Sequence, residues 1–193
     1  MPKAKPRAKK SARTKTKTRK AAKPSSKAKV KIKGRVTAIP KGHERVTPHL
    51  IVDDASGAIA FYKRAFDAKE INRAPSPDGS KLMHAEIQIG QSRFFLADEF
   101  PEFGGTPRNP KALGGSTVTI HQYVKNVDKV VEQAARAGAT VKMPPMDAFW
   151  GDRYAVISDP YGHDWSFATH IKNVKPEEMA RAAEEMFGGK KTI

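Results

Sequence analysis

Apolar residues recur along the chain with two periods, and these periods alternate between strand-like and helix-like stretches. The stretch "VTPHLIV" (46–52) is rich in β-branched residues and predicts a strand. In "DDASGAIAFYKRAF" (53–66), apolar residues at helical spacing predict a helix that Asp53 or Asp54 can cap. The residues expected on the buried side of this helix are Ala58, Ile59, Tyr62, Ala65 and Phe66.

The same order of elements is expected twice. In the first half, strands at 68–74, 81–89 and 92–98 follow the helix, with a turn at "PSPDG" (75–79). The fold class predicted is α+β, with two tandem βαβββ modules at about 46–99 and 117–170. The second half has expected strands at 117–124, 140–145, 153–159 and 164–170 and a helix at 126–139 that ends at Gly138.

The two modules also match each other in sequence. When the chain is shifted by 72 residues, one ungapped register superposes strand, helix, turn and last strand. This self-similarity predicts a duplicated module. The identical pairs are Val46, Thr47, His49 and Val52 with Val118, Thr119, His121 and Val124, Arg64 and Ala65 with Arg136 and Ala137, and Gly79, Gly90 and Phe95 with Gly151, Gly162 and Phe167.

Several phrases of the chain are similar to a known family. "HAEIQIGQSRFFLADE" (84–99) and "FWGDRYAVISDPYGHDWSFATH" (149–170) resemble the vicinal oxygen chelate superfamily, which includes glyoxalase I, bleomycin-resistance proteins and extradiol dioxygenases, and within it the PhnB-like branch. The resemblance covers about 46–186. It implies that the modules form a curled mixed sheet around a cavity, and that the protein is a homodimer.

Charge is distributed very unevenly. Residues 1–35 carry 12 Lys, 4 Arg and no acid, whereas the rest of the chain is neutral by count. This composition predicts a disordered Lys-rich tail, which either contacts nucleic-acid phosphates without sequence specificity or only aids solubility. The expected organisation is then the tail, a linker at 36–45, the two-module domain at 46–170, and a C-terminal helix and tail at 171–193.

Other compositional features limit the class of protein. The chain has no cysteine, which excludes disulfides and thiolate chemistry. No apolar run approaches the roughly 20 residues of a membrane span, and the N-terminus lacks the apolar region of a secretory signal, so a cytoplasmic protein is expected. In "PEEMARAAEEMF" (176–187), Met179, Ala182, Ala183 and Met186 form an apolar stripe that supports the expectation of a homodimer.

The resemblance bears on metal binding. In metal-dependent members, four His, Gln or Glu ligands come from the first and last strands of the two modules. The 72-residue register places Thr47, Thr119, Phe94 and Ser166 at these positions. A phenyl ring cannot ligate and neutral hydroxyls are poor ligands, so neither a metal nor another cofactor is expected.

Strand alternation predicts that a different set of polar residues faces the cavity. If Leu50 and Val52 pack against the helix, His49 faces the cavity. The same parity turns His121 and Tyr123 inward in the second module and His84, Glu86 and Gln88 inward on the third strand. His49, His121 and a carboxylate could form a displaced zinc or nickel site, or they could be hydrogen-bonding pocket residues. Glu86 is the candidate general base, with an ion pair to Arg153 as the alternative.

The phrase "FWGDRY" places Trp150 beside Asp152 and Arg153. An aromatic plane next to an acid–base pair can stack on a flat ligand and fix its polar groups. Alternatively, Trp150 closes the cavity while Asp152 and Arg153 pair to hold the loop. Further along, 159–162 is expected to form a tight turn with Gly162 at positive φ, followed by Trp165 and Phe167 in the core.

Three functions are compatible with this sequence. The first is a small-molecule-binding protein of the glyoxalase/bleomycin-resistance type, without the usual metal site. The second is an enzyme, either a glyoxalase-like lyase or isomerase or a dioxygenase, that uses a displaced metal site. The third is a nucleic-acid-associated protein that acts through residues 1–35. The expected ligand-binding residues are His49, His84, His121, Tyr123, Trp150, Asp152 and Arg153.

Overall fold

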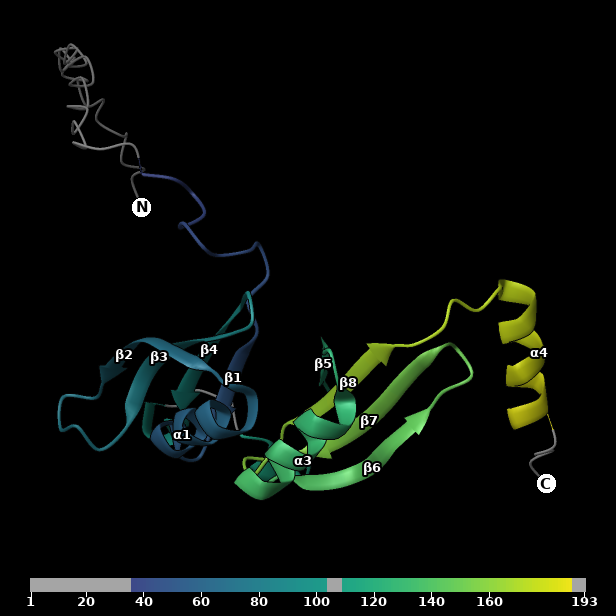
Figure 1. Ribbon diagram of the computed structural model, residues 1–193. Coiled ribbons are helices and arrows are strands. Elements are labelled where there is room, and N and C mark those ends of the chain that lie inside the picture. Colours follow the sequence, from purple (N-terminus) through teal and green to yellow (C-terminus); the bar gives the residue numbers. More distant parts are fainter. Residues whose placement is uncertain (1–35, 104–108, 189–193) are drawn as a thin grey trace, which may run out of the picture. The chain divides into compact units, whose positions relative to one another are not determined.

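The computed structural model describes residues 36–103 and 109–188 of the chain (Figure 1). The basic residues 1–35 lie outside these ranges, so the predictions about the tail stay predictions. In the described part, the chain forms two four-stranded mixed sheets, each from one βαβββ module. The predicted fold class is confirmed, although the two sheets are separate rather than hydrogen-bonded into one.

The first module has the strand order β1-β4-β3-β2, in which β1 and β4 are parallel and the other neighbours antiparallel. A single turn of 3-10 helix and the short helix α2 follow it along the chain. The bounds are β1 His49–Val52, α1 Ala55–Phe66, β2 Lys69–Pro75, β3 Leu82–Ile89, β4 Ser92–Asp98, η1 Pro101–Phe103 and α2 Pro110–Leu113.

The second module repeats this arrangement in the order β5-β8-β7-β6, again with a parallel pair, β5 and β8. A final helix, α4, follows the last strand (Figure 1). The bounds are β5 Thr119–Tyr123, α3 Val127–Ala137, β6 Thr140–Asp147, β7 Asp152–Ser158, β8 Asp164–His170 and α4 Pro176–Phe187.

Capping side chains set the ends of the two long module helices. The Asp54 carboxylate accepts a hydrogen bond from the Gly57 amide at 2.8 Å, and Asn126 does the same for Lys129 in α3 at 2.9 Å. Both side chains satisfy amide donors that have no partner inside the helix. Helix α3 ends at Gly138, whose φ of 117° favours glycine. The predicted cap and the predicted end are both confirmed.

Each sheet has one face covered by a helix and one open face. The predicted alternation is confirmed on β1, where Leu50 and Val52 are buried and His49 is exposed. On β8, Trp165 and Phe167 are completely buried, as predicted. The core is continuous between the modules, since the rings of Phe66 on α1 and Trp165 lie 4.7 Å apart.

One buried carboxylate links the two modules. Asp159 lies in the turn before β8 and accepts hydrogen bonds from the Tyr62 hydroxyl of α1 at 2.6 Å and from the Trp165 indole at 3.0 Å. The amides of Tyr161 and His163 donate to its other oxygen, both at 2.9 Å. Burial, together with this carboxylate, raises the pKa of Tyr62 well above its usual value. The turn at 159–162 therefore has a structural role, as predicted.

The ungapped 72-residue register is wrong for the last strands. His49 is paired with Phe95 in the first module, and its equivalent His121 is paired with Ser166 in the second. The residue equivalent to Ser166 is therefore Phe95, which faces the open side, and not Phe94, which is buried against the helix. Register shifts in β2 and β6 show that the two modules accommodate bulges at different places.

Helix α4 forms where the sequence predicts it, but none of its residues is buried. Its apolar stripe is partly exposed, and Met186 and Phe187 are 55% and 61% exposed. No helix in the described ranges is long and apolar enough to cross a membrane.

Candidate functional site

The open face of the first sheet carries a buried carboxylate held by three side chains. Glu86 on β3 is only 5% exposed. The guanidinium of Arg93 forms an ion pair with it, the Asn72 amide donates to its second oxygen at 2.9 Å, and Nε2 of His43 lies 3.2 Å away. The predicted alternative, an ion pair of Glu86 with Arg153, was wrong, because Arg93 on the neighbouring strand β4 supplies the positive charge.

Two histidines and a phenyl ring form a second cluster on this face. The rings of His49 and His84 lie 6.3 Å apart, and both pack edge-on to Phe95, at 6.1 and 4.9 Å between centroids. Burial and the neighbouring His84 lower the pKa of His49. The His49 imidazole therefore favours its neutral form, which can both donate and accept a hydrogen bond. The sequence correctly placed His49, His84 and Glu86 on one face.

The open face of the second sheet carries a different set of polar groups. Nδ1 of His121 lies 2.8 Å from the Ser166 hydroxyl, and its ring packs edge-on to Tyr123 at 4.9 Å. Tyr154 on β7 lies on the same face, and its ring is stacked nearly parallel to that of His121, with 6.3 Å between centroids. Tyr123 is 66% exposed, so its ring is available to a ligand. His121 and Tyr123 share one face of the sheet, as strand alternation predicted, and their role in ligand binding stays a prediction.

Asp152 joins this face to the segment that leads to α4. The carboxylate is 6% exposed, lies 2.7 Å from Nδ1 of His170, and accepts a longer hydrogen bond of 3.4 Å from the Tyr123 hydroxyl. Nε2 of His170 lies 3.0 Å from Oδ1 of Asn173. The hydrogen bond to Asn173 and the Asp152 carboxylate raise the pKa of His170. The histidine thus holds a positive charge more readily than usual.

Trp150 lies in an apolar cavity at the end of the same face. Its ring packs edge-on to Tyr154 at 5.5 Å and to Phe149 at 5.1 Å. The cavity has a volume of about 560 Å³ and is closed on one side by the end of α4. Its other apolar lining residues are Met143, Met146, Met186 and Phe187.

Arg153 does not belong to this cavity. Successive strand residues point to opposite faces, so Asp152 faces the open side and Arg153 faces α3. There Arg153 binds both oxygens of Asp128 at 2.7 Å and one oxygen of Asp147 at 2.8 Å. These carboxylates raise the pKa of Arg153 and the guanidinium lowers the pKa of Asp128. The predicted pairing of Asp152 with Arg153 was wrong, and the expectation that Arg153 meets a ligand stays a prediction.

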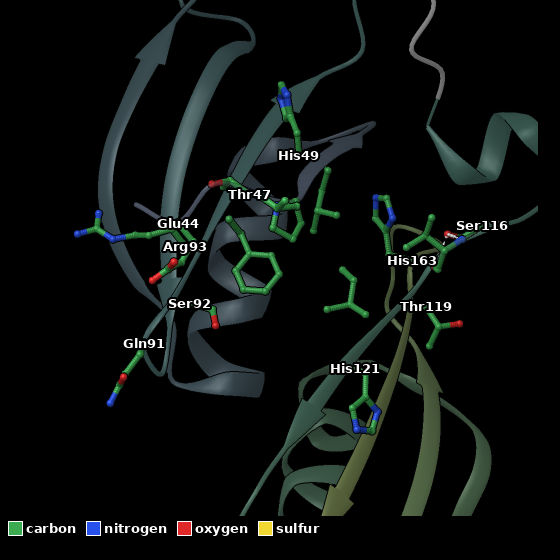
Figure 2. Close-up of a pocket in the computed structure, with 16 residues that line it drawn as sticks. Glu44, Thr47, His49, Gln91, Ser92, Arg93, Ser116, Thr119, His121 and His163 are labelled. Atoms are coloured by element: carbon green, nitrogen blue, oxygen red, sulfur yellow. Dashed lines mark hydrogen bonds between the residues drawn. The ribbon is translucent and has the colours of Figure 1, made fainter. Parts of the chain in front are cut away.

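A larger cavity, of about 810 Å³, lies between the first strands of the two modules. Figure 2 shows Thr47 and His49 on one side of it and Thr119, His121 and His163 on the other. Thr47 and Thr119, like His49 and His121, are equivalent residues of the duplicated modules. The cavity therefore lies where the two halves of the chain face each other.

The residues at the superfamily's metal positions do not fit a divalent transition metal. With the corrected register these positions are Thr47, Thr119, Phe95 and Ser166. The phenyl ring has no donor atom, and the Ser166 hydroxyl already bonds to His121. Within residues 36–103 and 109–188, no group of three or more His, Asp or Glu side chains is close enough to hold a metal ion.

Several residues of these faces were not predicted. Arg93 and Phe95 share the open side of β4, and strand alternation could have identified them once the buried position of Phe94 was known. Tyr154 follows from the same rule applied to β7. His43 lies in a segment that the sequence indicated only as a linker, and no sequence pattern identified its contact with Glu86.

Comparisons with known proteins agree with this architecture. Residues 43–167 match the family model of the Glyoxalase/Bleomycin resistance protein/Dioxygenase superfamily. The uncharacterized protein Mb0911c of Mycobacterium bovis is 45% identical over 145 residues, which are 75% of this chain and 95% of that protein.

Solved structures are similar as well. A gene product of Arabidopsis thaliana, At5g48480, is 26% identical with a TM-score of 0.53, over 65% of this chain and 98% of its own. TioX from Micromonospora sp. ML1 is 24% identical with a TM-score of 0.53, over 66% of this chain and 99% of its own. At that identity the likeness to TioX concerns the fold alone.

Proposed function

We propose that this chain, which belongs to the Glyoxalase/Bleomycin resistance protein/Dioxygenase superfamily, binds a small molecule on the open faces of its two sheets without the usual metal site. The observation that carries the proposal is the cavity of about 560 Å³ around Trp150 and Tyr154. Cavities that bind small molecules are mostly apolar, with a few polar groups that fix orientation. The Asp152–His170 pair supplies such groups on the same face.

The chemistry of this cavity favours a flat, largely apolar ligand. Aromatic rings stack on flat partners, and methionine side chains adapt to irregular shapes. Trp150, Tyr154 and three methionines provide both kinds of surface. A polar end of the ligand would reach Tyr123 and the Asp152–His170 pair, and His121 offers a further hydrogen-bonding nitrogen.

A binding role is also supported at Glu86. Its carboxylate already forms an ion pair with Arg93 and accepts a hydrogen bond from Asn72, which favours a role as a fixed acceptor over that of a general base. The alternative, an enzyme that uses a displaced metal at His49 and His121, would need a third ligand brought to them. A stoichiometric transition metal in protein purified without chelators would support that alternative.

We further propose a homodimer. Strands β1 and β5 are edge strands of their sheets, and exposed edges are commonly covered by another chain. The open sheet faces and the partly exposed stripe of α4 offer apolar surface to a second copy. Light scattering at micromolar concentration is expected to give the mass of a dimer, and a monomer mass would refute this part of the proposal.

We also infer membership of the PhnB-like branch, from the phrases "WGDR" (150–153) and "DPYGHDW" (159–165). These phrases include Trp150 and Asp152, which lie at the proposed site, and Asp159 and Trp165, which hold the two modules together. The branch does not by itself name a ligand.

The proposal is tested with the dye ANS (anilinonaphthalene sulfonate), a flat aromatic probe whose fluorescence rises in apolar sites. Full-length protein is expected to bind it saturably, and Trp150→Ala is expected to weaken binding while the urea unfolding transition stays cooperative. Ile171→Ala is the matched control, because Ile171 is 50% exposed and does not line the cavity. Equal loss in both variants would indicate non-specific adsorption and not a site.

A further inference from the structure

The segment that precedes β1 contacts the first sheet through one side chain. In the 37–46 segment every residue is exposed except His43, whose side chain is 18% exposed. A turn presents this residue, since the His43 amide donates to the Pro40 carbonyl at 3.2 Å. The segment is therefore docked on the sheet through His43.

His43 covers part of the open face of the first sheet, at Glu86 and Phe95. Its Nε2 is 3.2 Å from Oε1 of Glu86, and its ring centroid is 5.8 Å from that of Phe95. Gly42 makes this approach possible. It has a φ of 84°, and a Cβ there would lie 3.1 Å from the Arg93 guanidinium.

Among the residues that the structure describes, only one of the two ring nitrogens of His43 has a hydrogen-bonding partner. Within the described residues, Nδ1 of His43 is buried and has no hydrogen-bond partner. An unpaired buried polar atom opposes burial of the ring, whereas the Nε2 contact favours it. The rest of the segment is exposed and adds little apolar burial. His43 is therefore held only weakly against the sheet, so a ligand can displace it.

We propose that the 37–46 segment is a built-in competitor, in which His43 occupies the Glu86–Phe95 end of the open face until a ligand displaces it. This inference rests on the proposed function of that face. It also indicates the class of ligand: a flat ring with an N–H donor, such as a nitrogen heterocycle. Glu86 would accept the N–H, and Phe95 with His84 would contact the ring.

The contacts of Glu86 explain this preference. Arg93 fixes the carboxylate at Oε1 and Asn72 fixes it at Oε2, both from within the sheet, and His43 shares Oε1 with Arg93. Because Arg93 already supplies a positive charge, a neutral N–H donor suffices. A ligand carrying a carboxylate at this end would meet the Glu86 charge instead, which disfavours it.

The test uses full-length protein and benzimidazole as the probe, with binding followed by NMR chemical shifts. His43→Ala removes the competitor. If the segment is docked in about nine molecules of ten, this change tightens the apparent Kd for benzimidazole about tenfold. His43→Gln keeps a donor that can reach Glu86 and is expected to give an intermediate Kd. Lys41→Ala, an exposed residue of the same segment, is the matched control and is expected to bind as the wild type does.

The location of the shifts separates this inference from the proposed function. Shifts in His43→Ala are expected at Asn72, Glu86 and Phe95, together with faster hydrogen exchange of the amides of 37–46. The inference is overturned if His43→Ala and Lys41→Ala bind the probe equally, or if the shifts fall only around Trp150. The latter result would leave the cavity around Trp150 intact as a binding site. Failure of the proposed function itself would appear as no saturable shift on either face in any variant.

Discussion

The hydrogen bond between Tyr62 and Asp159 is expected to contribute measurably to the stability of the whole domain. Tyr62 belongs to α1 of the first module, and Asp159 lies in the turn before β8 of the second. Both side chains are buried, with exposures of 0% and 5%. Tyr62→Phe removes the hydroxyl donor and keeps the ring that packs on Phe66 and Trp165.

The loss of unfolding free energy in Tyr62→Phe depends on how many hydrogen-bond donors Asp159 keeps. Asp159 keeps the Trp165 indole and the two turn amides as donors, so its carboxylate stays partly satisfied. A hydrogen bond to a charged group contributes about 1.5–3 kcal/mol, so Tyr62→Phe should lower the free energy of unfolding by that amount. For a domain of this size, such a change lowers Tm by roughly 3–12 °C. Asp159→Ala leaves the Tyr62 hydroxyl and the Trp165 indole without an acceptor and should cost at least about 4 kcal/mol.

The assay is urea unfolding followed by circular dichroism, with Tyr161→Phe as the matched control. Tyr161 is a neighbouring tyrosine whose hydroxyl makes no hydrogen bond to any described residue, so its loss should change stability by less than about 0.5 kcal/mol. If Tyr62→Phe is as mild as the control, the bond between the modules does not contribute as argued. If the slope of the urea transition falls, the modules unfold separately, and the continuous core is in doubt.

The remaining predictions concern titration and the tail. NMR titration should give His170 a pKa above 6.5, and Asn173→Ala or Asp152→Asn should lower that pKa. The stability that this histidine contributes should be present below pH 6.5 and lost as the pH rises through the higher pKa of the folded protein. A pKa at or below 6.5 would refute the contacts described. Stability should also fall as pH rises above about 10, because the unfolded chain loses the Tyr62 proton before the folded protein does. Tyr62→Phe should flatten that fall, and an unchanged profile would contradict the assignment. The full-length chain should bind DNA with a log affinity that falls with log salt by about 0.9 per neutralised phosphate, and deletion of residues 1–35 should abolish this binding. Binding retained by the truncated domain would show that the folded domain itself contacts the nucleic acid.

Local sequence patterns predicted the elements of this fold well. The bounds of β4 and β8 agree with the apolar and β-branched runs, and α3 ends at the predicted glycine. These features depend on residues close in sequence, namely strand alternation, side-chain caps and a positive φ. The division of His49, Glu86 and His121 onto open faces followed from the same alternation.

Pairing between strands could not be predicted in this way. The register of β8 differs by one residue from that implied by the repeat. The turns before the last strands also differ in length, since Ile89 pairs with Ser92 before β4 whereas Ser158 pairs with Asp164 before β8. The partners of charged residues were also wrong. Arg153 pairs with Asp128 and not with Asp152, and Glu86 pairs with Arg93, since these choices depend on which strand or helix lies alongside.

The main proposal for this protein is that the open faces bind a small molecule without a metal. It is tested most directly by titrating full-length protein, purified without chelators, with ANS before and after dialysis against EDTA, while the metal content of the same sample is measured. We expect saturable binding that EDTA leaves unchanged and a transition-metal content far below stoichiometric. Stoichiometric zinc, nickel, manganese or iron, with dye binding lost after EDTA treatment, would contradict it.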